Sequence, residues 1–105
     1  MTPRHQDDTG NETVTREVTK VRRPKQYRVL IHNDDYTTMD FVVSVLERIF
    51  KKTPSEAVQI MLSVHHKGHG VCGIYPREIA ETKVDLVHRA AAEKGYPLKC
   101  SMEEA

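Results

Sequence analysis

Hydrophobic and polar positions alternate along one early segment of this chain, which predicts a strand. From Tyr27 the residues Tyr-Arg-Val-Leu-Ile-His form the pattern of a largely buried strand that ends at Asn33. Two shorter apolar runs, over residues 71–74 and 98–102, predict two further strands. The sequence therefore provides three strands, separated by longer segments with a different period.

The segment after the first strand predicts two helices in succession. Thr37 or Thr38 can cap a helix over about residues 38–51, with Asp40 three residues after Thr37 in the capping-box position. Thr-Pro-Ser-Glu at residues 53–56 is a stronger start signal, because proline at the first helical position loses no hydrogen bond and glutamate can bond back to the cap. This second helix runs to about residue 66. Its predicted buried stripe consists of Ala57, Ile60, Met61 and Val64.

A third helix is predicted between Pro76 and Gly95, and it completes the order β-α-α-β-α-β. Its inner face consists of Ala80, Val84, Val87 and Ala91. If each element packs antiparallel to the one before it, the first strand lies in the centre of the sheet. The predicted fold class is therefore α+β, a sandwich of a three-stranded antiparallel sheet covered on one face by three helices.

The chain divides into a tail and one domain. Residues 1–25 hold six basic and four acidic side chains, five threonines and no aromatic residue, so they offer little to offset the entropy of ordering. We expect residues 1–25 to form a flexible N-terminal tail and residues 26–105 to form the core domain. With 105 residues the chain is too short for a two-domain enzyme with a deep cleft.

Charge and cysteine content narrow the class of protein further. The formal net charge of +1 gives no electrostatic basis for nucleic-acid binding, and no apolar run is long enough to span a membrane or act as a signal peptide. Cys72 and Cys100 are too few for the disulfide framework of a small secreted domain. We therefore expect a cytoplasmic protein with no membrane or nucleic-acid partner, in which both cysteines are small buried apolar side chains.

An acidic turn is the clearest candidate for chemistry. Asn33, Asp34 and Asp35 place three acceptors, two of them anionic, directly before a helix start. They could simply cap the helix and shape the turn. Alternatively, the surplus acceptors could bind a cation, and a protonated peptide α-amine offers three donors at pH 7. A lone pair of aspartates is too common to indicate Mg²⁺ or Ca²⁺.

A histidine-rich segment follows at the end of the second helix. His65, His66 and His69 with Cys72 superficially resemble zinc ligands, but adjacent helical residues point about 100° apart, so no metal or other cofactor is expected. His65 lies one turn after Met61 and can bring a polar ring to the edge of an apolar patch. No nucleophile, phosphate-loop or metalloprotease motif is present, which does not support an enzyme.

The order of these motifs resembles one family. Asn33-Asp34-Asp35-Tyr36-Thr37, then Met39, and some twenty residues later Met61-Leu62-x-Val64-His65 are similar to ClpS, the adaptor of the bacterial ATP-dependent Clp protease. Gly68, Cys72-Gly73, Glu81-Thr82-Lys83 and Pro97-Leu98 continue the resemblance, which covers about residues 27–105. The chain departs from the pattern at two positions. The family often has proline in place of Thr38 and an apolar residue in place of Lys99.

The resemblance implies a non-enzymatic adaptor of the N-degron pathway, a monomer when free. It would bind proteins whose first residue is Leu, Phe, Tyr or Trp and pass them to the AAA+ unfoldase ClpA, which works with the ClpP peptidase. Asn33, Asp34 and His65 would bond the α-amine and first peptide group, with Asp35 supplying charge nearby. The resemblance implies a side-chain pocket formed by Thr37, Met39, Val42, Val43, Met61, Val64 and Leu98. Glu78 and Lys83 resemble the positions that dock the unfoldase, and the tail would serve delivery.

Two alternatives of other classes stay open from the sequence. One is a plain protein-interaction domain of similar α+β shape without amine recognition, as in the C-terminal domain of the ribosomal stalk protein. The other is a small metal-dependent hydrolase, which would require stoichiometric metal. Binding of a peptide with a free N-terminal Phe but not of its acetylated form would separate amine recognition from the first alternative.

Overall fold

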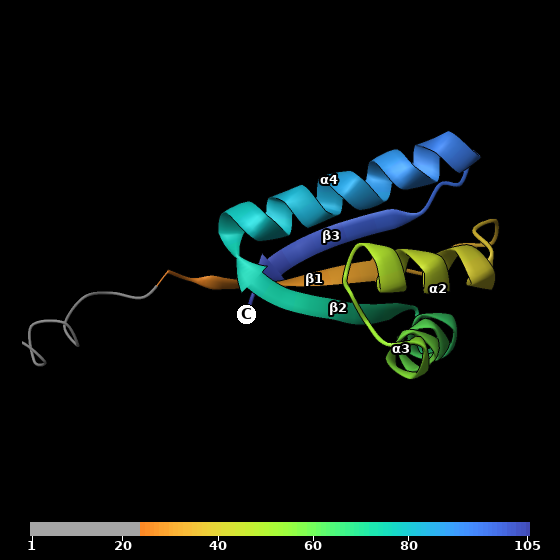
Figure 1. The fold of residues 1–105 in the computed structure, drawn as a ribbon, viewed down its shortest axis with the longest axis horizontal. Helices are drawn as coiled ribbons and strands as arrows, with labels where there is room; N and C mark the ends of the chain where they lie inside the picture. The colour runs from red at the N-terminus through yellow and green to blue at the C-terminus, as the bar shows by residue number, and fades with distance from the viewer. Residues whose placement is uncertain (1–23) are drawn as a thin grey trace, which may run out of the picture.

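The computed structural model describes residues 24–105, which form a three-stranded antiparallel sheet and three helices (Figure 1). Strand β1 lies between β2 and β3 and is antiparallel to both, so the predicted topology is confirmed. Residues 1–23 lie outside the part of the chain that the structure describes, so the predicted tail over residues 1–25 stays a prediction. The elements in chain order are β1 (Gln26–His32), α2 (Met39–Arg48), α3 (Pro54–Lys67), β2 (His69–Pro76), α4 (Arg77–Lys94) and β3 (Lys99–Glu104).

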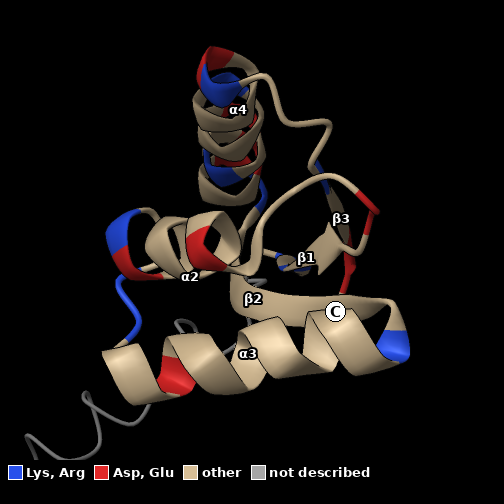
Figure 2. Cartoon of the chain, turned by 90° about the vertical axis from the view of Figure 1, so that its right-hand side faces the viewer, with Lys and Arg blue, Asp and Glu red and all other residues tan. Residues whose placement is uncertain are grey.

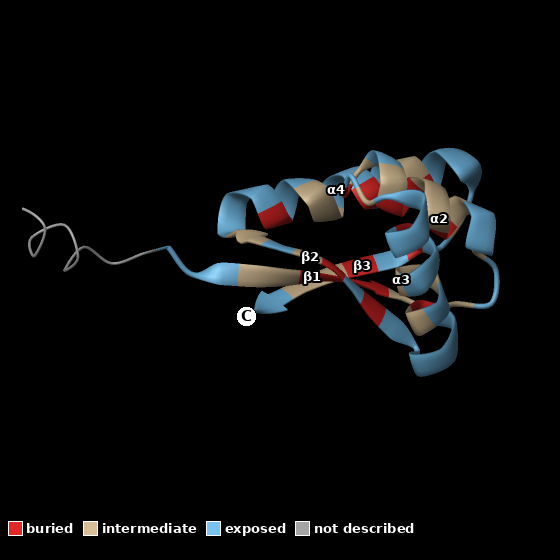
Figure 3. Ribbon diagram, turned by 60° about the horizontal axis from the view of Figure 1, so that its bottom comes forward, coloured by how far each residue is buried: buried red, intermediate tan, exposed pale blue. Residues whose placement is uncertain are grey.

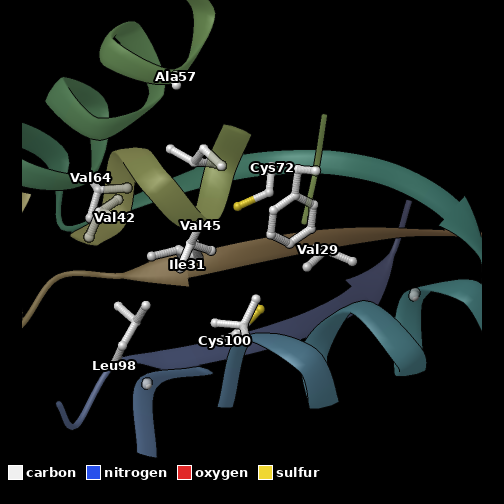
Figure 4. Packing of buried hydrophobic residues seen from close by; sticks show 14 residues of the cluster. Val29, Ile31, Val42, Val45, Ala57, Val64, Cys72, Leu98 and Cys100 are labelled. Atoms are coloured by element: carbon white, nitrogen blue, oxygen red, sulfur yellow. The ribbon is translucent and has the colours of Figure 1, made fainter. Parts of the chain in front are cut away.

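One face of the sheet forms the floor of the hydrophobic core. Val29 and Ile31 of β1 are fully buried, and Cys72 of β2 and Cys100 of β3 flank them on either side (Figure 4). Both cysteines are free thiols. Burial raises the pKa of the Cys100 thiol to about 12 and also raises that of Cys72, so neither ionises near neutral pH. The expectation that they act as small buried apolar side chains is confirmed.

All three helices contribute buried residues to this core (Figure 3). Helix α4 contacts all three strands, whereas α2 and α3 contact each other and α3 contacts β2. The predicted inner faces of α3 and α4 are confirmed, because each of their residues is either buried in the core or partly buried and packed against it. The α+β sandwich with helices on one face of the sheet is therefore the observed fold.

Helix α3 begins as its sequence predicts, and α2 is capped by one of its two predicted threonines but ends earlier than predicted. Thr53 and Glu56 form a complete capping box at the start of α3. In α2 the cap is Thr38, which accepts a hydrogen bond from the backbone N–H of Phe41, so the expected capping-box pairing of Asp40 with Thr37 is wrong. The helix ends at Arg48 rather than at residue 51, where the lysine has a φ of 57°.

The strands are longer than their apolar runs. Strand β2 spans residues 69–76 because its backbone pairs with β1 beyond the predicted segment 71–74, from His69 opposite His32 to Pro76 opposite Gln26. The register shifts between Val29 and Leu30, where β2 holds an extra residue. Within residues 24–105, no helix has the length and apolar content needed to cross a membrane.

Candidate functional site

A cavity of about 430 Å³ lies between the loop that joins β1 to α2, the first turns of α2 and the second half of α3. This volume is within the range of about 300–1,000 Å³ that is usual for small-ligand sites. The loop contributes six of the lining residues and the two helices contribute the rest. The lining residues are Asn33, Asp34, Asp35, Tyr36, Thr37, Thr38, Met39, Val42, Met61, Val64 and His65.

The polar side of the cavity is a turn that closes on the carboxylate of Asp34. One of its oxygens, Oδ1, accepts hydrogen bonds from the backbone N–H groups of Tyr36, at 2.8 Å, and Thr37, at 2.7 Å. The other, Oδ2, accepts the hydroxyl of Thr37 at 2.7 Å. A carboxylate has about four acceptor positions, and these three bonds leave one for a further donor. Asp34 therefore shapes the turn and still has capacity to bind a ligand.

The same hydrogen bonds keep Asp34 ionised. Partial burial alone would raise the pKa of this carboxyl, but the bonds from Thr37 and Tyr36 outweigh it and lower the pKa below the usual value of 3.8. The side chain consequently carries a full negative charge at neutral pH. Asp35, the next residue, is exposed and adds a second carboxylate to the cavity wall.

A backbone hydrogen bond connects this acidic loop to the end of α3. The N–H of Asn33 donates to the carbonyl of Gly68 at 2.8 Å. Gly68 is the C-cap of α3 and has a φ of 92°, a left-handed conformation that glycine adopts without strain. His65 lies on the last turn of the same helix, and this bond therefore fixes the position of Asn33 relative to the last turn of α3.

The electrostatics of the cavity mouth favour a cation. The loop between β1 and α2 carries two carboxylates, visible as its red stretch in Figure 2. The Asn33–Gly68 hydrogen bond joins this loop to the C-terminal end of α3. That end adds the partial negative charge of a helix C-terminus. Both effects make the potential at the cavity mouth favourable for a positively charged group.

The remaining wall of the cavity is apolar. Val42 and Val64, 5% and 3% exposed, approach each other from α2 and α3 (Figure 4) and also belong to the hydrophobic core. Met61 is partly buried beside them, and Met39 at the first turn of α2 is 45% exposed. The cavity thus has a rigid valine base and two methionines, which are unbranched and can adapt to different ligands.

The structure brings most of the predicted site residues together. Nine line the cavity, whereas Val43 packs partly buried against the core and Leu98 is buried in it, and neither lines the cavity. Tyr36 and Thr38 line it although the sequence analysis did not place them there. The signal for both was their position inside the acidic turn motif itself.

The two residues expected to dock a partner lie on α4, whose N-terminal end is at the opposite end of the domain from the acidic loop (Figure 1). Glu78 is exposed and borders a second hollow of about 550 Å³ that Tyr27 and Ile79 also line. Lys83 is partly buried, and its Nζ donates to the carbonyl of Ile49 at 2.7 Å. This bond joins α4 to the C-terminal end of α2.

The histidine-rich segment is spread over two elements and a turn. His65 and His66 are exposed neighbours with ring centroids 5.3 Å apart, and His69 begins β2 beyond Gly68. Cys72 lies in the core. Within residues 24–105, no group of three or more histidine, cysteine, aspartate or glutamate residues is arranged to hold a metal ion.

The fold and site define a binding module, and the comparisons with known proteins identify its family. Residues 22–101 match the family model "ATP-dependent Clp protease adaptor protein ClpS". A Clp protease adapter protein ClpS of Nitratidesulfovibrio vulgaris is 57% identical over 97 residues, covering 92% of this chain and 97% of that protein. The corresponding protein of Desulfatibacillum aliphaticivorans is 52% identical over 103 residues, with 98% of both chains covered.

A solved structure gives the same result. Agrobacterium tumefaciens ClpS2 bound to L-phenylalaninamide superposes with a TM-score of 0.76 at 36% identity, covering 79% of this chain and all of that one. The chain therefore belongs to the ClpS family of adaptors of the ATP-dependent Clp protease. It is a protease adaptor and not an enzyme, as the sequence analysis predicted.

Proposed function

We propose that this adaptor binds the free N-terminal Leu, Phe, Tyr or Trp residue of substrate proteins and delivers them to the AAA+ unfoldase ClpA and its ClpP peptidase. The observation that carries this proposal is the cavity in which an acidic turn and an apolar wall adjoin. The turn offers acceptors to an α-amine, and the apolar wall offers a place for a large side chain on the same residue. An N-terminal residue carries both groups on the same Cα.

The amine would be bound by charge and hydrogen bonds together. Asp34 has one unused acceptor position and a full negative charge, and Asn33 and His65 line the same cavity from the loop and from α3. Asp35 supplies further negative charge. An ammonium with three donors can satisfy all of them at the mouth of the cavity, where hydrogen bonds to charged groups contribute about 1.5–3 kcal/mol each.

The side chain of the first residue would fill the apolar part of the cavity. Val42 and Val64 form the base, Met39 and Met61 the walls, and Thr37 borders the polar side. Full burial of a Leu or Phe side chain contributes about 1.5–3 kcal/mol. L-Phenylalaninamide, bound to the ClpS2 relative, has a free α-amine and a Phe side chain, which supports this assignment.

Delivery would use a surface separate from the cavity. We propose that Glu78 and Lys83 on α4 contact the unfoldase, with exposed Ile79 beside Glu78 as an apolar contact. Because Lys83 also bonds to the end of α2, Glu78→Arg is the sharper test of docking. The adaptor would act as a monomer in the cytoplasm, a reducing compartment in which two free thiols are usual.

The decisive experiment is a fluorescence anisotropy titration of the full chain with peptides that begin with Phe, free or acetylated. Acetylation removes the positive charge and leaves the acceptors of Asp34 and Asn33 without their ligand. We expect it to cost about 2–5 kcal/mol of binding free energy. Affinities within threefold of each other would reject amine recognition and favour a plain interaction domain.

A paired variant would assign the amine site. Asp34→Asn keeps an oxygen that can accept the backbone N–H groups of the turn but removes the charge, whereas Asp85→Asn removes an exposed carboxylate of α4 that does not line the cavity. Asp34→Asn should lower the affinity for the free peptide by at least tenfold. Asp85→Asn should leave it unchanged.

A further inference from the structure

Tyr36 is the most exposed large hydrophobic residue in the described part of the chain. It is 75% exposed and does not belong to the hydrophobic core, so the fold gains almost nothing from this ring. Nevertheless it lines the cavity that holds the acidic turn. An exposed aromatic ring at the rim of a binding cavity is a frequent contact for a ligand, since it offers a large area with few rotatable bonds.

The backbone of Tyr36 is held rigidly. Its N–H donates to Asp34 Oδ1 at 2.8 Å, and the next residue, Thr37, bonds to the same carboxylate through both its N–H and its hydroxyl. Thr38 then caps α2. Consequently the ring extends from a fixed base and loses only its own side-chain freedom when a ligand packs against it.

The position of the Tyr36 backbone determines which part of a bound peptide its ring can contact. If the α-amine bonds to the carboxylate of Asp34, it lies beside the group that also accepts the backbone N–H of Tyr36. The first side chain enters between Met39 and the valines, so the chain must leave through the mouth. Successive Cα atoms are about 3.8 Å apart. The second residue therefore lies at the rim within reach of the Tyr36 ring.

We infer that Tyr36 selects the second residue of the bound N-terminus by stacking on its side chain, with a preference for planar groups, namely aromatic rings and the guanidinium of Arg. This inference rests on the proposed recognition of a free N-terminal residue. Aromatic pairs and cation–π contacts at exposed sites predict that such second residues bind about 2- to 10-fold more tightly than serine. Asp35 lies beside Tyr36 and could favour Arg through charge alone, so the test must separate stacking from charge.

The test uses peptides that share a free N-terminal Phe and differ only at the second residue: Ser, Trp, Arg or Lys. The readout is the affinity ratio of each peptide to the Phe-Ser peptide, measured for the wild type and for Tyr36→Ala, Tyr36→Phe and Asp35→Asn. Leu86→Ala, which trims an exposed apolar side chain on α4, is the matched control.

The stacking hypothesis makes a distinct prediction for each protein. In the wild type, Phe-Trp and Phe-Arg should exceed Phe-Ser by about 2- to 10-fold. Tyr36→Ala should bring the Phe-Trp ratio close to one and lower the Phe-Arg ratio to that of Phe-Lys, because the charge of Asp35 remains, whereas Tyr36→Phe and the Leu86→Ala control should preserve both ratios. Asp35→Asn should lower the ratios of Phe-Arg and Phe-Lys together but leave that of Phe-Trp unchanged.

Two results would overturn the inference and leave the proposed function intact. Tight binding of all four peptides without dependence on the second residue is the first. Ratios that Tyr36→Ala leaves unchanged are the second, because the preference would then arise from charge at Asp35 or from another surface. If no peptide with a free N-terminal Phe binds, the proposed function itself fails, and the inference about Tyr36 fails with it.

Discussion

The backbone N–H of Asn33 donates to the carbonyl of Gly68 at 2.8 Å, which ties the start of the acidic loop to the C-cap of α3. The two residues are far apart in sequence but belong to one structural unit at the cavity mouth. Through this bond the loop that carries the carboxylates and the helix that carries His65 keep a fixed spacing. The geometry of the amine site therefore depends on a helix cap.

Gly68→Ala should weaken peptide binding through this cap. Nothing lies within 4 Å of a Cβ placed at Gly68, so the substitution adds no clash, but a φ of 92° is unfavourable for alanine. We expect a loss of about 1–2 kcal/mol in the free energy of unfolding. Displacement of the α3 end should also weaken the bonds to the amine and lower the affinity for a Phe peptide by about 2- to 10-fold.

Gly95→Ala provides a matched control for this prediction. Gly95 caps α4 with a φ of 76° and likewise has nothing within 4 Å of an added Cβ, but its carbonyl accepts no hydrogen bond from the acidic loop, unlike that of Gly68. Urea denaturation should show a similar loss of stability for both variants, while anisotropy should show reduced affinity for Gly68→Ala alone. Equal affinities of the two variants would mean that the cap does not position the site.

Thr37→Val should make the contribution of Asp34 to stability visible as a pH dependence. The variant lacks the hydroxyl that donates to Asp34 Oδ2, so the pKa of Asp34 should rise toward its usual value. The folded-state pKa of Asp34 is depressed in the wild type, so its stabilisation is complete above the unfolded value of about 3.9 and is lost as the pH falls through the folded-state pKa. The difference in unfolding free energy between the two proteins, about 1 kcal/mol at pH 6, should shrink below about pH 4.

Thr82→Val is the control for this pH dependence. The Thr82 hydroxyl donates to the backbone carbonyl of Glu78 at 3.1 Å, which involves no titrating acceptor. Any loss of stability in this variant should be the same at pH 6 and pH 3.5. Urea denaturation at both pH values, together with an NMR titration of the Asp34 carboxyl, measures the two effects, and a Thr37→Val difference that persists undiminished at pH 3.5 would contradict the assignment.

The sequence predicted those elements whose signals are local. Thr53 and Glu56 form their capping box because both partners are three residues apart within one turn. The acidic turn was also foreseen, but not which threonine caps α2. That choice depends on Asp34, which engages the Thr37 hydroxyl and leaves Thr38 as the cap. A pattern of residue types does not show which of two competing hydrogen bonds forms.

Side-chain direction explains where the expectation of the pocket and the observed cavity differ. The resemblance to ClpS placed Val43 and Leu98 in the pocket, and both are apolar and close to it in sequence or space. In the structure Val43 packs partly buried against the core, and Leu98 is 4% exposed within it. Tyr36 lines the cavity although its side chain is exposed. Tertiary packing, rather than residue type, decides which side of each residue meets the cavity.

Deleting residues 1–17 should separate binding from delivery. The deleted segment precedes the ClpS family match, which begins at residue 22, and none of the cavity-lining residues is removed. We expect the affinity for a Phe peptide to stay within about twofold, whereas degradation of a substrate with an N-terminal Phe by the unfoldase and peptidase should be impaired. Loss of peptide binding in the truncated protein would contradict this separation. Undiminished degradation would show that delivery does not need the segment.

Met39 should act as a gate that excludes β-branched first residues. It follows the acidic loop directly, lines the cavity and is 45% exposed, so it borders the path that a first side chain takes from the amine site to the valine base. Leu, Phe, Tyr and Trp have an unbranched Cβ and can pass it. Ile and Val carry a second heavy atom on Cβ with restricted χ1, which would press against the methionine at a cost of ~1–3 kcal/mol, or roughly 10- to 200-fold in affinity.

Met39→Ala should relieve this clash, and the sign of the change differs between ligands. Peptides that begin with Ile or Val should gain affinity, because the opposing side chain is gone. Peptides that begin with Leu or Phe should lose a little, because apolar contact area is removed at about 25 cal/mol per Å². Met61→Ala is the matched control: it also trims a methionine from the cavity wall but lies on α3 rather than directly after the acidic loop. Anisotropy titrations with the four peptides should show a higher Ile-to-Leu affinity ratio for Met39→Ala than for Met61→Ala or the wild type. An unchanged ratio in Met39→Ala would reject the gate while leaving the amine site intact.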